Sequence, residues 1–351
     1  METEISKKQI LDRLINSYLS TASDEVSNVE GSFTFDTLAA NAVEFEKTYA
    51  ELNLVLEASF PQTSWGEYLT AKAEEHGVIR KPETNAVVTL TLTGKANTVV
   101  PKGSLFSTMN GINFLTLADI TIKGDGTASV KAQAMDSGSA GNVKAGTILK
   151  IPVTIYGVTS VTNKADAYDG FERETDQELL KRLLFKVREP ATSGNVYHYK
   201  LWASSVPGVG AVKILPLWNG NGTVKVLVLD TNKNAASEDL INKVKAEIDD
   251  NAPIGATVTV SAPDLLTVDI SLKVTSGDGK ESGIKDAVNN YFKERLFNAD
   301  AISYAQIGRI ILDNPELTGV YDYNELTING QTINVSIKGT QLPVVGTVTL
   351  K

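Results

Sequence analysis

The sequence predicts a multidomain α+β protein in which a helical arm precedes a β-rich module and two small α/β units. Three observations carry this prediction. In the first 76 residues, apolar positions recur every three to four residues, as on amphipathic helices. Short Val-, Thr- and Ile-rich runs separated by glycines follow, and after them strand patterns alternate with helix patterns. A chain of 351 residues has room for about two to four domains. We expect divisions at 1–80, 81–165, 166–264 and 265–351.

The arm is predicted to contain two long helices and a shorter third. The first has its apolar positions between Ile5 and Leu19, and a polar stretch, Ser20 to Ser32, interrupts it. The second extends from Asp36 to Ser59 without glycine or proline. At 1.5 Å per residue it would be roughly 36 Å long.

The second helix carries an apolar stripe that could face partner helices or pack on a sheet of the same chain. For one stripe, packing within the chain is the more common explanation. Further apolar residues at Val43, Leu54 and Phe60 widen the surface beyond a single face, however, so we keep both interpretations. The stripe consists of Leu38, Phe45, Tyr49, Leu52, Val55 and Leu56.

Several residues are placed to start or stop helices. Ser64 with Glu67 fits a capping box for the third helix, and Gly77 is placed to end it. Thr192 or Ser193 is expected to cap a helix at 194–205. We expect Ser237 to do the same for a helix at 237–250.

The segment from Asn85 to Asn163 is predicted to be a β-sandwich or a small barrel. Threonines at 89, 91 and 93 alternate with larger apolar residues, which is the period-two pattern of a strand. Frequent glycines then separate short strand-like runs. A module of this kind could instead bind carbohydrate or adhere to a host surface. That alternative would favour exposed aromatic residues, of which the segment has few, and glycan-array binding by residues 85–165 would test it.

The last two units are predicted to be α/β sandwiches of the ferredoxin-like kind. The order of elements suggests that one is a cyclic permutation of the other. In the first unit we expect helices at 173–188, 194–205 and 237–250 and strands at 210–217, 222–230 and 256–262. In the second we expect strands at 266–275, 319–328, 331–338 and 342–350 and helices at 282–296 and 303–313.

Composition excludes several classes of function. The chain has no cysteine, which rules out disulfides, thiol catalysis and thiolate metal sites. A net charge of −9 and a pI near 5.0 argue against a surface that grips nucleic-acid phosphates. No apolar run approaches the ~20 residues needed to span a bilayer, and no signal-peptide pattern is seen at the N-terminus. We therefore expect no membrane partner and synthesis in a reducing cytoplasm.

No constellation of side chains indicates catalysis, a metal or a cofactor. His76 and His198 are the only histidines, and neither has a second ligand four residues on. The segment from Asp230 to Ile241 resembles a calcium loop but lacks the glycine at position 6 and the glutamate at position 12. Gly277–Gly283 lacks the spacing of a phosphate loop, and there is no Gly-x-Ser-x-Gly elbow. We therefore predict a protein that is not an enzyme and needs no cofactor.

Four sequence motifs, in order, resemble one family. They are Gly77-Val-Ile-Arg80, Val100-Pro-Lys-Gly-Ser104, the glycine-rich Gly138 to Thr147, and the stretch Gly170 to Asp230 with its Pro-Ala-Thr-Ser-Gly break and Pro-Gly-Val-Gly turn. Together they are similar to the baseplate J-like family, the wedge proteins of contractile phage tails and phage-tail-like bacteriocins. The resemblance covers nearly the whole chain.

The resemblance implies a structural role. A second copy of the chain and a smaller wedge protein, similar to tail protein I, would form each wedge. The wedges would ring a hub, contact an inner lysozyme-like baseplate protein and the sheath, and couple a baseplate change to contraction. Assembly would take place in the bacterial host cytoplasm before the baseplate of the tail particle is released.

Two regions are the expected contact surfaces. One is the apolar stripe of the arm. The other is the C-terminal strand pattern with Val344, Val345 and Val348, because an unguarded strand edge readily accepts another chain. For this second region the alternative is a strand that only closes the sheet of its own domain.

Overall fold

The computed structural model describes residues 5–21, 27–189, 191–297 and 299–351. The chain divides into two compact units, Met1–Arg80 with Thr175–Val187, and Lys81–Glu174 with Arg188–Lys351. The second unit contains a barrel, a central domain and a C-terminal domain. Within the described ranges, none of the helices combines the length and the apolar character that a membrane crossing requires. The prediction of a mixed α+β chain with N-terminal helices, a β-rich module and two small α/β domains is confirmed.

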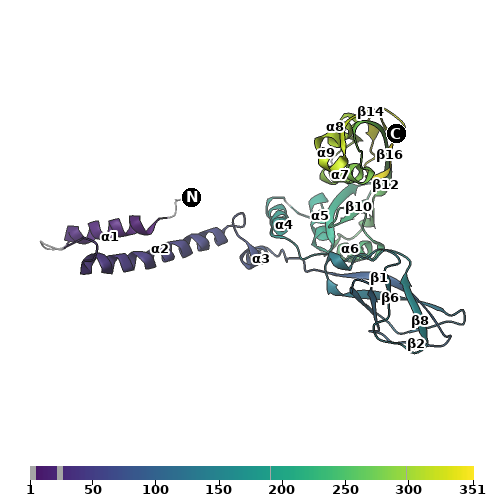
Figure 1. The fold of residues 1–351 in the computed structure, drawn as a ribbon, viewed down its shortest axis with the longest axis horizontal. Coiled ribbons are helices and arrows are strands. Elements are labelled where there is room, and N and C mark those ends of the chain that lie inside the picture. The colour runs from purple at the N-terminus through teal and green to yellow at the C-terminus, as the bar shows by residue number, and fades with distance from the viewer. Residues whose placement is uncertain (1–4, 22–26, 190, 298) are drawn as a thin grey trace. The chain divides into compact units, whose positions relative to one another are not determined.

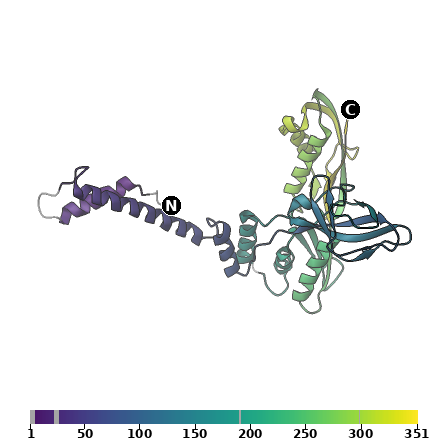
Figure 2. The same cartoon turned by 60° about the horizontal axis from the view of Figure 1, so that its bottom comes forward.

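The first unit is helical. Helices α1 (Lys7–Thr21) and α2 (Phe33–Ser59) lie side by side, as Figures 1 and 2 show, and bury Ile10 and Ala42 against each other. Helix α2 begins three residues earlier than expected. The reason is that Ser32 serves as its N-cap and accepts a hydrogen bond from the backbone N–H of Phe35 at 3.2 Å.

A small second core in this unit joins helix α3 (Gly66–Glu75) to helix α4 (Asp176–Arg188). Gly77 ends α3 as predicted. It has φ +64°, and the backbone N–H groups of Gly77 and Val78 return to the last turn of the helix. The core consists of Leu69, Ala73, Val78, Leu179 and Leu183.

The predicted capping box of α3 is wrong. Trp65 occupies the N-cap position without a side-chain hydrogen bond, and the hydroxyl of Ser64 is buried without a partner among the described residues. Instead, the backbone N–H of Gly66 donates to Oδ2 of Asp176 at 2.9 Å. The carboxylate that satisfies this helix start therefore comes from α4 rather than from the neighbouring sequence.

The β-rich module is a nearly closed barrel. Its six strands follow the order β7-β3-β4-β6-β1-β8, and every pairing is antiparallel. The backbone N–H of Gly146 donates to the carbonyl of Asn163 at 2.7 Å, next to the two ends of the sheet. The strands are β1 (Asn85–Gly94), β3 (Leu105–Thr108), β4 (Asn113–Thr116), β6 (Thr127–Ser137), β7 (Ile148–Lys150) and β8 (Val158–Asn163).

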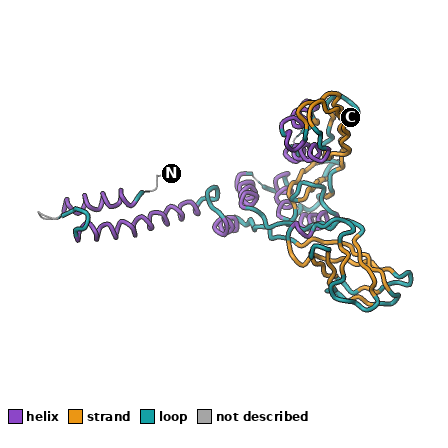
Figure 3. Tube along the Cα trace, viewed as in Figure 1, coloured by secondary structure: helices purple, strands orange, loops and turns teal. Residues whose placement is uncertain are grey.

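The barrel core follows from the alternating pattern in β1. Val88, Leu90 and Leu92 point inward and are buried, and they pack with Phe106 and Phe114. Figure 3 shows the module as strands and loops. A short ribbon of β2 (Val99–Val100) and β5 (Ile120–Thr121), and a 3-10 turn η1 (Ser139–Gly141), complete it.

The central domain packs two helices on a three-stranded sheet. Strand β10 (Thr223–Asp230) lies in the middle, antiparallel to β9 (Val209–Pro216) and parallel to β11 (Thr257–Ser261). Helix α6 (Glu238–Asn251) is capped by Ser237, as predicted. Helix α5 (Val196–Ser205), however, is capped by Asn195 and not by Thr192 or Ser193.

The position of the α5 cap has a geometric cause. Ser193 takes a positive φ of +46°, which an N-cap residue does not. Asn195 is extended, and its Oδ1 accepts from the backbone N–H of His198 at 2.9 Å.

The C-terminal domain also has a three-stranded sheet. Strand β12 (Asp264–Gly277) is central, antiparallel to β14 (Val320–Ile328) and parallel to β16 (Gln341–Leu350). Helices cover one face of this sheet (Figure 1): α7 (Glu281–Glu294), α8 (Tyr304–Asp313) and the short α9 (Pro315–Thr318).

Two predictions for this domain need correction. The strand expected at 331–338 is reduced to β15 (Val335–Ser336), which pairs with β13 (Ala301–Ile302) in a separate two-stranded sheet and does not extend the three-stranded sheet. The cyclic permutation is also wrong. It equates β11 with β12, yet β11 is an edge strand and β12 is central. The two sheets share one parallel and one antiparallel pairing, but the chain passes through them in a different order.

Candidate assembly surface

Helix α1 covers only the first part of α2. The backbone N–H of Lys7 donates to Glu46 at 2.5 Å, and the guanidinium of Arg13 reaches the Tyr49 hydroxyl at 3.3 Å and lies over its ring. Leu38 and Tyr49 are therefore half-buried, while Phe45 remains 46% exposed. The N-terminal residues of the predicted stripe therefore pack partly against α1 of the same chain.

The remaining part of α2 is uncovered. All residues from Glu51 to Glu57 are exposed, and the apolar side chains in this stretch, with that of Phe60 just beyond it, show half or more of their surface. A helix that is apolar on more than one face is normally buried. Large contiguous exposed apolar surface marks an interaction site. We call residues 51–60 the exposed α2 segment; its apolar members are Leu52, Leu54, Val55, Leu56 and Phe60.

The valines of β16 lie mainly inside their own domain. Val345 and Val348 belong to the core of the C-terminal domain, and Val344 is half-buried. Strand β16 is an edge strand whose one paired side is on β12. The backbone N–H of Val345 donates to Oδ1 of Asn289 at 3.4 Å. A contact with another copy would thus use the backbone edge of β16, and that contact stays a prediction.

The polar residues singled out from the sequence take local roles. The imidazole of His198 stacks on Trp202 at 4.1 Å and accepts from the backbone N–H of Gly194. Asp230 accepts from the backbone N–H of Asn234 at 2.8 Å within a turn, and burial raises the pKa of its carboxyl group. Within the described ranges, no group of three metal-ligating side chains comes together.

Two ion pairs that link distant parts of the sequence were not predicted. Arg80 contacts Asp176 at 2.6 Å inside the first unit, and Lys131 of the barrel contacts Asp239 of the central domain at 2.7 Å. No sequence signal could have found them, because the partners are 96 and 108 residues apart.

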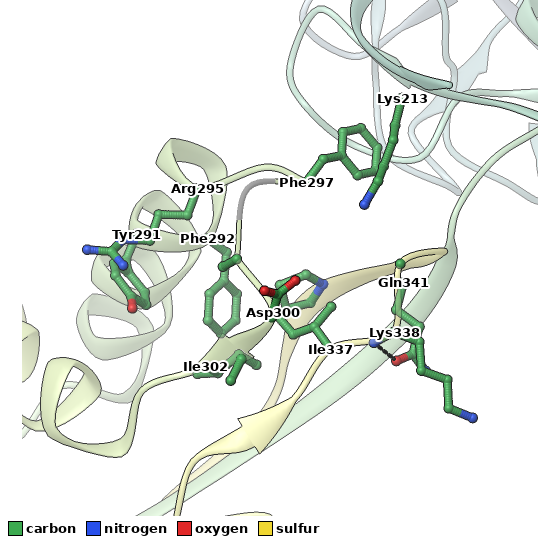
Figure 4. A pocket seen from close by; sticks show the side chains of 14 residues that line it. Lys213, Tyr291, Phe292, Arg295, Phe297, Asp300, Ile302, Ile337, Lys338 and Gln341 are labelled. Atoms are coloured by element: carbon green, nitrogen blue, oxygen red, sulfur yellow. Dashed lines mark hydrogen bonds between the residues drawn. The ribbon is translucent and has the colours of Figure 1, made fainter. Parts of the chain in front are cut away.

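Two pockets formed by described residues of the second unit do not have the composition of an active site. One, drawn in Figure 4, holds about 30 Å³ and is lined by Lys213, Arg295, Lys338 and Asp300 among aromatic residues. The other is an open cleft of about 300 Å³ with a mainly apolar lining. Neither brings two carboxylates and a nucleophile together. The exposed α2 segment is a surface typical of an assembly protein.

Comparison with known proteins agrees with this class. Three family models match: the baseplate J-like protein barrel domain at residues 89–170, the baseplate J-like central domain at 191–262, and the baseplate J-like protein C-terminal domain at 266–351. The chain belongs to the baseplate J-like family, as the motifs indicated. It is a structural baseplate protein of the phage-tail type and a component of the baseplate particle, not an enzyme.

The relatives have similar length. The chain is 36% identical to the uncharacterized protein YqbT of Bacillus subtilis, over 98% of this chain and 97% of the relative. It is also 36% identical to the phage-like element PBSX protein XkdT of the same organism, over 97% and 95%. Baseplate protein gp47 of Escherichia phage Mu is 29% identical over 75% and 76%. A chain in the six-fold symmetrised cryo-EM structure of the anti-feeding prophage baseplate has a TM-score of 0.40 at 12% identity, over 98% and 99%.

Proposed function

We propose that the chain is a wedge component of a contractile tail baseplate. Two copies and a smaller protein similar to tail protein I form each wedge. The wedges ring the hub, contact an inner lysozyme-like protein and the sheath, and couple the baseplate change to contraction. The single observation that carries this proposal is the exposed α2 segment, which is the kind of surface that a helical bundle covers. The wedges are assembled in the bacterial host cytoplasm and are then carried in the released particle.

Energetics favour the exposed α2 segment as the main contact. Fully burying one Leu, Val or Phe side chain stabilises a complex by roughly 1.5–3 kcal/mol. Burying most of the five apolar side chains of the segment would contribute on the order of 10 kcal/mol, which is comparable with the ~4–15 kcal/mol cost of association. A complex that covered only one or two of them would not offset that cost.

Charged substitutions in the stripe test the proposal. Phe45→Glu combined with Leu52→Glu should abolish co-purification of the second copy and the smaller protein, because each carboxylate would have to be desolvated at the contact. The control is Thr37→Glu combined with Asn41→Glu, which adds the same charge at exposed polar positions of α2 that lie outside the exposed α2 segment. Both variants should melt like the parent chain. Complex formation by the stripe variant at the level of the control would contradict the proposal.

We also propose that β16, the strand of Val344, Val345 and Val348, contributes to contacts between neighbouring copies around the ring through its backbone edge. Support comes from the position of β16 at the sheet edge, where unpaired backbone groups accept another strand. The division at 1–80, 81–165, 166–264 and 265–351 is kept as a proposal. Helix α4 lies within the third of these ranges but packs in the first compact unit.

A further inference from the structure

The barrel and the central domain are joined by polar contacts at the start of α6. The ammonium group of Lys131 and the hydroxyl of Tyr168 both donate to Oδ2 of Asp239, at 2.7 and 3.0 Å. Two residues earlier, the hydroxyl of Ser237 donates to the carboxylate of Asp169 at 2.8 Å. The residue that caps α6 is therefore itself fixed to the barrel segment.

Buried contacts reinforce this boundary. The ammonium group of Lys81, which is 8% exposed, donates to the carbonyl of Val209 at 2.8 Å. Phe171 packs against Gly208 so closely that a Cβ on Gly208 would lie 2.6 Å from its ring. Phe171 is itself buried. Close-packed contacts of this kind resist deformation because small displacements already cause overlap.

The boundary between the central and C-terminal domains is different. An open cleft of about 300 Å³ separates the loop at Asn234 and Ala235 from α7 and from Val344 on β16. The smaller pocket adjoins it, and there the ammonium group of Lys213 lies 5.5 Å from the ring of Phe297 (Figure 4). Such a contact contributes only modestly when it is exposed to solvent. Unfilled space means that side chains lack partners and can move without breaking contacts.

We infer that the barrel and the central domain move as one rigid body and that the C-terminal domain pivots against them. The pivot is the two-residue connection Ala262–Pro263 between β11 and β12, since hinges form at the ends of elements. The open cleft gives the domain room to rotate. This inference concerns the chain alone and does not depend on the partners proposed above.

Distance measurements between spin labels test the inference directly. The chain has no cysteine, so two introduced cysteines are labelled specifically. One pair, Lys123→Cys with Ala246→Cys, spans the barrel and the central domain. The other pair, Ala246→Cys with Glu316→Cys, spans the central and C-terminal domains. All three positions are exposed. We expect the distance distribution of the second pair to be at least twice as wide as that of the first. Equal widths would overturn the inference.

A second measurement tests whether the polar contacts of Asp239 keep the barrel and the central domain in a fixed relative position. Lys131→Ala, Tyr168→Phe and Asp239→Ala together should widen the first distribution at least 1.5-fold and leave the second unchanged. The matched control is Lys144→Ala with Asp166→Ala, which removes a 2.8 Å ion pair inside the barrel. The control should change neither distribution. An unchanged first distribution in the triple variant would count against the inference.

Discussion

Asp239 and Asp169 sit near the start of the same helix, and their pKa values are shifted in opposite directions. The hydrogen bond from Lys131 holds the pKa of Asp239 below its usual range, with a smaller contribution from Tyr168. Burial raises the pKa of Asp169, although the hydrogen bond from Ser237 opposes the shift. One carboxylate therefore stabilises the boundary in its charged form, while the other carries a desolvation cost.

The stability of the contact between the barrel and the central domain should depend on pH, because it depends on the charge of Asp239. Its pKa is lower in the folded than in the unfolded chain, so its contribution is present above the unfolded pKa and is lost as pH falls through the folded value. Asp239→Asn should therefore lower the free energy of unfolding at pH 7 by less than about 1 kcal/mol, since the pair is partly exposed. At about pH 2.5, which lies below the ordinary pKa of an aspartate (~3.9), the loss should be smaller. Urea unfolding at both values measures this, and an equal loss at both would contradict it.

At the base of the arm, Asp176 has two functions. It accepts from the first backbone N–H of α3 and pairs with Arg80, whose side chain is only 8% exposed. Asp176→Ala removes a helix cap and a charge partner together, so we expect a loss of about 2 kcal/mol, measured by hydrogen exchange in α3.

The control for Asp176 is an exposed ion pair of the same type. Asp313 pairs with Arg309 across one helical turn of α8, and both side chains are more than half exposed. Asp313→Ala should cost less than about 0.5 kcal/mol. If the two variants lose the same amount, the burial of Arg80 does not determine the strength of its pair.

The candidate surface could be predicted from the sequence to the extent that it depends on local periodicity. Leu52, Val55 and Leu56 follow helical spacing, and they lie exposed on α2. Which part of the stripe α1 covers could not be predicted, since it depends on how two helices meet. The contacts of Asp176 and Asp239 could not be predicted either, because no local sequence feature distinguishes these two residues from any other acidic residue in the first turn of a helix.

At the scale of elements, the long helices and, with one exception, the strands given ranges in the last two units were placed within a few residues for the same local reason. The predictions fail where the structure of an element depends on a segment that is distant in the sequence. The residues expected as a strand at 331–338 follow a tight turn in which Asn329 and Gly330 have positive φ, but Val335–Ser336 pair with the distant strand β13 and not with the free side of β14. A strand pattern thus predicts an extended backbone but not which strand it pairs with.

Deleting residues 342–351 should unfold the C-terminal domain. The deletion removes nearly all of β16 and takes Leu342, Val345 and Val348 out of buried positions. Losing one such side chain already costs on the order of 1–5 kcal/mol. A lower melting temperature of the deleted chain, before any assembly, is the expected result. A deleted chain that melts like the parent would show that β16 contributes little to its own domain.

A substitution at the edge tests the proposed ring contact without disturbing the core. Thr347→Lys with Thr349→Lys places charge on exposed positions of β16, and lysine on an edge strand opposes pairing with another chain. We expect a normal melting temperature and wedges that fail to close into rings by electron microscopy. Normal rings would exclude a contact through this edge.

For the whole molecule, we predict that metal chelation has no effect on stability. The chain has no cysteine and two histidines, and His198 is engaged with Trp202 and the backbone of Gly194. Carboxylate-only sites need several convergent oxygens. The melting temperature with EDTA should equal that without it, and elemental analysis should find no stoichiometric metal. A shift of several degrees would contradict the prediction.

The position of α4 also has a consequence for how the protein is made. The small core around Leu69 and Val78 needs Leu179 and Leu183, which follow the entire barrel in the sequence. During synthesis at ~5–20 residues per second, this core cannot form until α4 has left the ribosome, several seconds after α3. The barrel can fold during this delay, whereas the nascent arm already displays its apolar helix. A ribosome-bound chain truncated before residue 176 is therefore the stage at which premature pairing of arms, or capture by a chaperone, should be greatest.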